Sequence, residues 1–236
     1  MSGRSEQACT VLVDSARRLD ELGHPAKAAS HRVQQAMILR RLGRVADARE
    51  ALPAPDQAEG HTRVAFLKER GEVQLESGQV DSAIADFDGA LRIERECYEA
   101  DDITTAGFEE SIADALFEAG RLEESEALTR KVLGVFAAVN HPNGAGALVT
   151  MALIEFTRGA EEEAEDRLEQ AIRLIGEAPL IEIANRARGL EAAGRRLERH
   201  GLARHALAFR VKAETCWTQL PGATDAVTVP AAIPCG

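Results

Sequence analysis

Short apolar stripes at helical spacing, separated by glycine, recur along most of the chain. In the stretch 72–91, EVQLESGQVDSAIADFDGAL, one stripe ends at Gly78 and the next begins with Ala83, Phe87 and Ala90. Glycine accepts the left-handed backbone conformation at a helix C-terminus at little cost, so this pattern predicts a helix, a turn and a second helix. The same order of residues recurs around Gly43, Gly120, Gly159 and Gly201. The chain is therefore predicted to be a series of repeats.

The stripes and their glycine or proline boundaries predict helices over most of the sequence. We expect them at residues 5–22, 25–42, 45–52, 62–77, 80–97, 103–119, 122–139, 143–158, 161–175, 180–200 and 203–218. The third helix is short because Pro53 and Pro55 cannot continue it. No segment alternates between apolar and polar residues for long enough to indicate a sheet, so the predicted fold class is all-α.

The spacing of the glycines predicts how the helices are arranged. Successive glycines from Gly43 to Gly201 are 35, 42, 39 and 42 residues apart, which is about the length of two helices and two turns. One such pair leaves an apolar face uncovered, and stacking the pairs covers it. We expect an α-solenoid of stacked antiparallel helix pairs. Its parts are N-terminal capping helices with an irregular first repeat (1–52), a loop (53–61), the regular repeats (62–219) and an extended or disordered tail (220–236).

Small residues at matching places in these pairs carry a family resemblance. The matching sets are Gly71, Gly78, Ala83, Phe87 and Ala90; Ala152, Gly159, Ala164, Leu168 and Ala171; and Gly194, Gly201, Ala206 and Ala213. Ala113 and Gly120 fit as well, with Ser125 and Val132 in place of two alanines. These residues resemble the tetratricopeptide repeat (TPR), in which two helices cross so closely that only small residues fit. The 39–42 residue units are similar to the extended repeats of kinesin light chains and bacterial TPR regulators. The resemblance covers roughly residues 29–218, and the short helix at 45–52 departs from it.

Composition and charge narrow the possible functions. The formal net charge is −11, which argues against a broad nucleic-acid-binding surface. The four cysteines, Cys9, Cys97, Cys216 and Cys235, are scattered without metal-ligand spacing and indicate a reduced, intracellular protein. The N-terminus lacks the apolar core of a signal peptide, and no apolar run approaches the ~20 residues needed to span a bilayer. We therefore expect a cytoplasmic protein without a membrane segment.

The chemistry expected of an enzyme is missing from the sequence. It contains no phosphate-binding loop, no GxSxG and no HExxH. The Glu21-Leu-Gly-His24 stretch resembles half of a di-iron site but has no second copy. His200 and His205 flank Gly201 without a third ligand, and we expect them to decorate the turn or cap a helix. The sequence thus predicts no catalytic residue, no metal and no cofactor.

The resemblance implies a candidate binding surface. In the family, the first helix of each pair lines the concave groove of the superhelix and contacts a protein or peptide. Carried over by position, the groove residues are Lys68, Glu72, Leu75 and Glu76; Glu110, Asp114, Phe117 and Glu118; Val149, Leu153, Phe156 and Thr157; Arg188, Glu191, Arg195, Glu198 and Arg199; and, in a less regular register, Val33, Met37, Arg40 and Arg41.

These residues predict a groove that is acidic in the middle, apolar in the third unit and basic at the far end. Such a groove would hold a partner with a basic stretch and an apolar anchor. The alternative is that the charged residues only form a solvated face. The tail sequence ATDAVTVPAAIPC, extended and nearly uncharged, is a candidate pseudo-ligand for the chain's own groove or a neighbour's.

The leading hypothesis is a non-enzymatic scaffold or adaptor that binds a protein or peptide partner in the groove. A ligand- or peptide-responsive regulatory protein is the main alternative, because repeat arrays flex between neighbouring units. The arginines within the first 45 residues leave open a degenerate DNA-binding helix-turn-helix, although both helices are longer than that motif uses. An all-helical enzyme is the third possibility, and no constellation of residues supports it.

Overall fold

The fold of the described part of the chain is entirely helical. The computed structural model describes residues 2–98, 101–139, 141–176 and 183–219. The helices are α1 (Ser2–Glu21), α2 (Pro25–Arg41), α3 (Val45–Ala51), α4 (Gly60–Glu76), α5 (Val80–Tyr98), α6 (Asp102–Glu118), α7 (Leu122–Ala138), α8 (Gly144–Thr157), α9 (Glu161–Gly176), α10 (Ile183–Arg199) and α11 (Ala203–Thr218), with a short 3₁₀ helix at Pro55–Gln57. The predicted tail at 220–236 lies outside the described residues.

The predicted helices are confirmed, and their ends differ from the expected ones by at most three residues. The 3₁₀ turn within the predicted loop at 53–61 was not anticipated. It begins with Pro55, whose fixed backbone suits the first position of a helical turn, and it is too short to leave a periodic signal. The all-α fold class predicted from the sequence is correct.

The glycines end the helices in the predicted way. Gly23, Gly43, Gly78, Gly120, Gly159 and Gly201 all have φ between 72° and 78°, the left-handed region that other residues rarely adopt. At Gly78 the turn is closed by backbone hydrogen bonds. The Gly78 amide donates to the Leu75 carbonyl (3.0 Å) and the Gln79 amide donates to the Gln74 carbonyl (2.8 Å).

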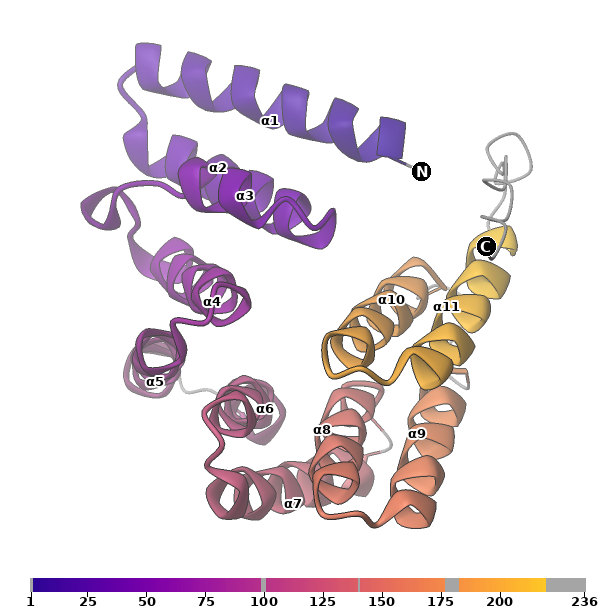
Figure 1. The fold of residues 1–236 in the computed structure, drawn as a ribbon. Helices are drawn as coiled ribbons and strands as arrows, with labels where there is room; N and C mark the ends of the chain where they lie inside the picture. The colour runs from indigo at the N-terminus through magenta and orange to yellow at the C-terminus, as the bar shows by residue number, and fades with distance from the viewer. Residues whose placement is uncertain (1, 99–100, 140, 177–182, 220–236) are drawn as a thin grey trace.

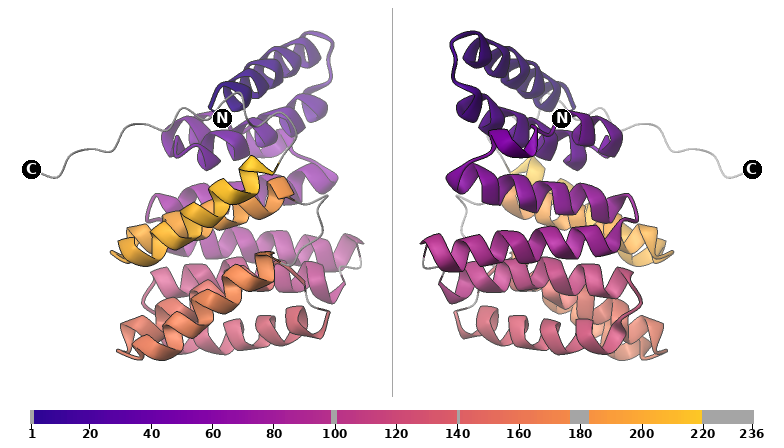
Figure 2. Two further views of the ribbon diagram at one scale, coloured as in Figure 1. Left: turned by 90° about the vertical axis from the view of Figure 1, so that its right-hand side faces the viewer. Right: turned by 90° about the vertical axis from the view of Figure 1, so that its left-hand side faces the viewer.

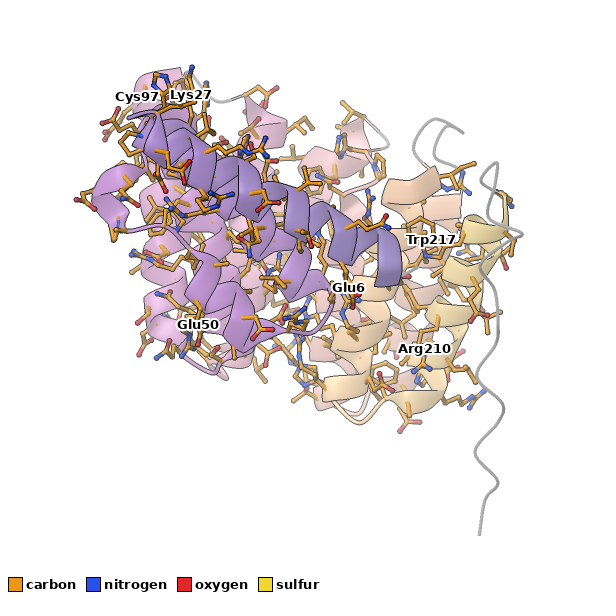
Figure 3. All side chains as sticks on the ribbon, turned by 90° about the horizontal axis from the view of Figure 1, so that it is seen from above. Glu6, Lys27, Glu50, Cys97, Arg210 and Trp217 are labelled. Carbon is orange, nitrogen blue, oxygen red and sulfur yellow. The ribbon has the colours of Figure 1, made fainter. Side chains whose placement is uncertain are left out.

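The helix pairs stack into a strongly curved superhelix (Figure 1). Helices α4, α6, α8 and α10 lie towards its middle, with α5, α7, α9 and α11 outside them, and α1 covers the first end (Figure 1). Side views show the pairs packed one on another in layers (Figure 2). From above, Glu6 on α1 and Trp217 on α11 lie towards the same side of the molecule (Figure 3), so the curvature brings the two ends of the array round towards each other. We call the surface formed by α2, α4, α6, α8 and α10 the inner face.

Small residues let the two helices of a pair approach closely. At Gly71 on α4, an added Cβ would lie 2.6 Å from the ring of Phe87 on α5, which is fully buried. Ala83 and Ala90, one turn away on either side, are also fully buried. Ser125 stands where the repeat pattern has alanine, and its small side chain fits the same closely packed position. Its buried hydroxyl donates to the Ala113 carbonyl at 2.8 Å, so the polar atom is satisfied.

Gly71 and Gly134 provide a matched test of this packing. We expect Gly71→Ala to destabilise the fold by about 1–3 kcal/mol, because the Phe87 ring has to move within a closed core. Gly134→Ala on α7, where an added Cβ meets nothing within 4 Å, should stabilise by up to about 1 kcal/mol through helix propensity. Urea unfolding of both variants measures the difference, and effects of the same sign would contradict the close approach.

Candidate functional site

One arginine of the inner face gathers three carboxylates. The Arg40 guanidinium on α2 lies 2.7 Å from Glu69, 3.0 Å from Glu76 and 3.4 Å from Glu72, all on α4. Burial by itself lowers the pKa of Arg40, but the three carboxylates outweigh it and raise that pKa above its usual range. Arg40 therefore stays charged and neutralises part of the acidic stretch predicted for α4. It also joins the first repeat to the second.

A second polar cluster links three inner helices. Arg196 on α10 donates from Nη1 to Asp114 Oδ1 on α6 (2.7 Å) and to Thr150 Oγ1 on α8 (2.8 Å), and the Thr150 hydroxyl donates to Asp114. Arg196 is only 8% exposed, and its guanidinium lies 5.9 Å from the centre of the Phe117 ring. Helices α6 and α10 belong to repeats two units apart. Arg196 thus bridges the curve of the superhelix and does not merely contact its sequence neighbour.

One turn further along both helices, a histidine makes a parallel contact. His200 Nε2 lies 2.9 Å from Glu118 Oε1, and the imidazole packs edge-on against Phe117 with the ring centres 5.2 Å apart. The hydrogen bond from His200 lowers the pKa of Glu118 despite partial burial. The expectation that His200 only decorates the turn is corrected: the residue follows the last turn of α10, but its side chain reaches α6. His205 likewise reaches a neighbouring helix, with Nε2 3.2 Å from Glu165.

Between these clusters lies Glu110 on α6, pressed against bare backbone. A Cβ at Gly146 on α8 would stand 1.8 Å from Glu110 Oε1, so with any other residue at position 146 this carboxyl group would have to move. Burial, followed by the charge of Asp114, raises the pKa of Glu110 to about 8, although Lys68 and Arg196 act in the opposite direction. Burial also raises the pKa of Asp114, against the effects of Arg196 and Thr150. Because Asp114 holds the arginine, Glu110 is the member of this pair that keeps its proton at neutral pH.

The apolar part of the predicted groove is not on the surface. Val149 and Leu153 on α8 are 1% and 2% exposed and belong to the core cluster shared by α8, α9, α10 and α11. Both side chains pack in the apolar interior of this part of the array. Phe117 is also nearly buried, and Phe156 is half-buried beside His205. The prediction of an open apolar patch in the third unit is therefore wrong.

The remaining predicted residues lie at several depths. Lys68 is exposed with its ammonium 5.2 Å from the centre of the Phe108 ring, and Leu75 is half-buried against the core. At the far end, Arg188 lies over the Trp217 ring (6.0 Å), and Glu191 accepts a hydrogen bond from Trp217 Nε1 (2.7 Å). Arg195 is half-buried, and Arg41 and Arg199 are exposed. Val33 is buried in the core and Met37 is half-buried. The Thr157 hydroxyl donates to the Leu153 carbonyl of its own helix, and Glu198 forms an ion pair with Arg210 on α11.

Sequence reasoning missed three residues that organise the inner face: Glu69, Thr150 and Arg196. A signal for one of them was present. Arg196 on α10 and His200 just after it are four residues apart, as are Asp114 and Glu118 on α6, so the two basic residues can pair with the two acidic ones. Arg195 and Arg199 have the same spacing, so the sequence does not tell which of the two pairs of residues faces Asp114 and Glu118. Only the packed structure shows that it is Arg196 and His200.

A separate concavity lies on the other side of α2. It has a volume of about 760 Å³ and lies between α1, α3 and the 53–57 segment, above Cys9 and Leu39. It opens where α3 is truncated. Its two arginines are already paired within the chain, Arg32 with Asp20 and Arg44 with Asp47. This concavity therefore offers a shallow mixed surface and not a convergent set of polar groups.

Within the described parts of the chain, the structure provides neither a group of three or more potential metal ligands nor a helix long and apolar enough to cross a membrane. The inner face is consequently the best-developed candidate site. Its polar groups come from five helices spread over some 160 residues of sequence.

Comparison with solved structures identifies the fold. BtubC (BKLC) from P. vanneervenii is 15% identical over 99% of this chain and 96% of its own, with a TM-score of 0.53. A Rap protein complexed with competence and sporulation factor is 12% identical over 92% of this chain and 71% of its own, with a TM-score of 0.57. Kinesin light chain TPR-like repeats from Podosopora anserina are 21% identical over 87% of this chain, but the TM-score of 0.41 is too low to add to the argument. No family model and no curated protein matches the sequence.

These findings define the class of protein. The chain has the TPR-like fold, an all-α solenoid of stacked helix pairs, as the glycine and alanine pattern predicted. At identities below 25% the comparisons show the fold alone, so the function has to be argued from the inner face.

Glu110 provides a pH test of the inner face. Because its folded-state pKa is raised from 4.5 to about 8, the folded protein keeps a proton that the unfolded chain releases within this window. Stability should therefore fall as pH rises from 4.5 to 8, by at most about 1.4 kcal/mol per pH unit. Glu110→Gln should remove this loss, whereas Glu123→Gln on the exposed side of α7 should not. Thermal unfolding at pH 5 and pH 8.5 measures the effect, and parallel curves for Glu110→Gln and the parent protein would contradict it.

Arg196 provides a test of the bridge between α6 and α10. Arg196→Ala leaves the half-buried Asp114 without its counter-charge and should cost about 3 kcal/mol. Amide hydrogen exchange should rise in α10 and α11 and stay unchanged in α4 and α5. Arg199→Ala, three residues along the same helix and exposed, is the matched control and should change stability by less than about 0.5 kcal/mol. Equal effects of the two substitutions would rule the bridge out.

Proposed function

We propose that this protein is a non-catalytic recognition module that holds a protein or peptide partner on its inner face. The observation that carries the proposal is the convergence of charged side chains from α2, α4, α6 and α10 on one curved surface. Lys68, Arg41 and Arg199 remain exposed there, beside paired groups such as Arg40 and Glu72. A helical array whose described part brings together no group of three or more potential metal ligands suits binding better than metal-dependent chemistry. We further propose that the protein acts in the cytoplasm as a scaffold or adaptor.

A partner with a basic stretch and an apolar anchor was the expectation from the sequence. Two features of the structure weaken its basis. Val149 and Leu153, the expected anchor site, are buried, and the acids of the inner face are engaged by Arg40, Arg196 and His200. The proposal therefore keeps the inner face and the protein or peptide partner, without the basic stretch and the anchor.

A ligand-responsive regulator is a second candidate, favoured by one specific feature. The α6–α10 contacts form a discrete element that could be made or broken, and a partner that binds one state better would change the curvature. The similar Rap protein is complexed with competence and sporulation factor, which fits a regulatory role for this fold. A regulator that binds DNA has less support, because Arg17, Arg32 and Arg44, all within the first 45 residues, are paired with carboxylates of the same chain.

Site-specific photo-crosslinking tests the proposal. A benzoylphenylalanine in place of Lys68, exposed on the inner α4, should crosslink a partner from an extract of the source cells. The same group in place of Arg92, exposed on the outer α5 of the same repeat, is the matched control and should not. A partner that is captured from position 92 and not from position 68 would place binding on the outer surface and refute the proposal.

The regulator can be separated from a rigid scaffold in the same preparation. Spin labels at positions 68 and 199 would report the spacing between α4 and α10 with and without the captured partner. A change in spacing on binding would favour the regulator, and a constant spacing would favour the scaffold.

A further inference from the structure

The concavity between α1, α3 and the 53–57 segment has a partly apolar lining. Its volume is about 760 Å³, and Cys9 and Val13 are among the residues of α1 that line it. Val13 is 45% exposed, so apolar surface of α1 lies open in this hollow. The side-chain amides of Gln35 and Gln57 also line it, and they can both donate to and accept from an extended backbone. A shallow surface of this kind suits a length of polypeptide more than a small polar molecule.

The charges around the concavity narrow the choice of occupant. Four carboxylates and two arginines line it, and both arginines are paired with carboxylates of the chain. The hollow therefore carries net negative charge. A segment with several acidic residues is disfavoured by repulsion, whereas an uncharged or a basic segment is not.

The chain itself contains an uncharged segment of suitable composition. The 17 residues from 220 to 236 lie outside the described part of the structure, and Asp225 is their only charged side chain. Residues 226–235, AVTVPAAIPC, carry no charge and are mostly apolar. Pro230 and Pro234 fix two of the backbone angles in this stretch, which lowers the conformational entropy that the segment loses on docking.

The end of α11 places this segment within reach of the concavity. Helix α11 ends at Thr218, and Figures 1 and 2 both show that end near the N-terminal end of α1. The α1 residues that line the concavity lie between Glu6 and Asp14, in the N-terminal part of that helix. Seventeen extended residues span at most about 55 Å, whereas the whole of α1 is only about 30 Å long. The segment is therefore long enough to run along α1.

We propose that residues 226–235 dock in an extended conformation in the concavity between α1 and α3, and so tie the last repeat to the first. The docked segment covers Val13 and closes the open end of the curve. A basic peptide of another protein is the other occupant that the charges allow. The chain's own segment is favoured over it because attachment to α11 gives an effective concentration on the order of millimolar. The inference goes beyond the proposed function, since it concerns a contact within the chain and requires no partner.

Photo-crosslinking from within the segment tests where it lies. With benzoylphenylalanine in place of Thr228, illumination of the full chain should join position 228 to residues 6–14 or 51–57, identified by mass spectrometry. Val13→Glu adds a charge to the hollow and should reduce the yield about fivefold or more. Val11→Glu on the same helix is the matched control, because Val11 is 66% exposed and lies outside the concavity, and the yield should stay within about twofold. Circular dichroism verifies that both variants fold.

Hydrogen exchange tests the same contact without a probe in the segment. Deletion of residues 220–236 should speed amide exchange in α1 about threefold or more, because the helix loses a contact that holds it on the array. Exchange in α6, far from the concavity, is the internal reference and should not change.

Each result supports or overturns the inference. Crosslinks from position 228 to α11, to the inner face or to a second copy, recognised by mixing ¹⁵N-labelled and unlabelled chains, place the segment elsewhere and overturn it. Equal yields in the two α1 variants, no crosslink at all or unchanged exchange in α1 also overturn it. The proposed function is tested separately by the crosslinks from positions 68 and 92, so either proposal can fail without the other.

Discussion

The partly buried ion pair between Arg196 and Asp114 connects two inner helices, α10 and α6, that are not neighbours in the array. Open solenoids hold each repeat only against its neighbours, so curvature is a sum of small local rotations. Here the pair joins repeats two units apart, and Thr150 on the repeat between them shares the same oxygen and nitrogen atoms. Taking two charges out of water is costly, so removing one partner is expected to destabilise the fold more than the intact pair stabilises it.

Much of the fold could be predicted from the sequence because its determinants are local. A glycine with positive φ, such as Gly78, ends a helix whatever surrounds it, and the two prolines after α3 stop that helix in the same way. Small residues such as Gly71 and Ala83 mark where two helices touch, and their recurrence gave the stacking. Even Ser125, a departure from the pattern, proved to be a small residue whose hydroxyl finds an acceptor nearby.

The candidate site was less accessible to the same reasoning. Positions carried over from the family placed Glu72, Asp114 and Glu118 on the inner face, where they lie, but not the groups that face them. Pairing with Arg40, Arg196 and His200 depends on how far the array curves, and curvature accumulates from crossing angles that periodicity does not encode. Because only the charges along each helix could be counted from the sequence, the groove was predicted to be acidic in its middle. The packed structure shows that chain groups from other helices face the acids of the groove, with Arg40 shared by three of them.

The contact between Glu110 and Gly146 has a consequence for sequence variation. A side chain at position 146 would occupy the space of the Glu110 carboxyl group, which would have to move or give way to a shorter residue. The two positions are thus coupled, although neither is part of the helix-pair pattern. Related chains with this curvature should vary them together, with glycine at 146 accompanying a long side chain at 110 and a larger residue at 146 accompanying a small one.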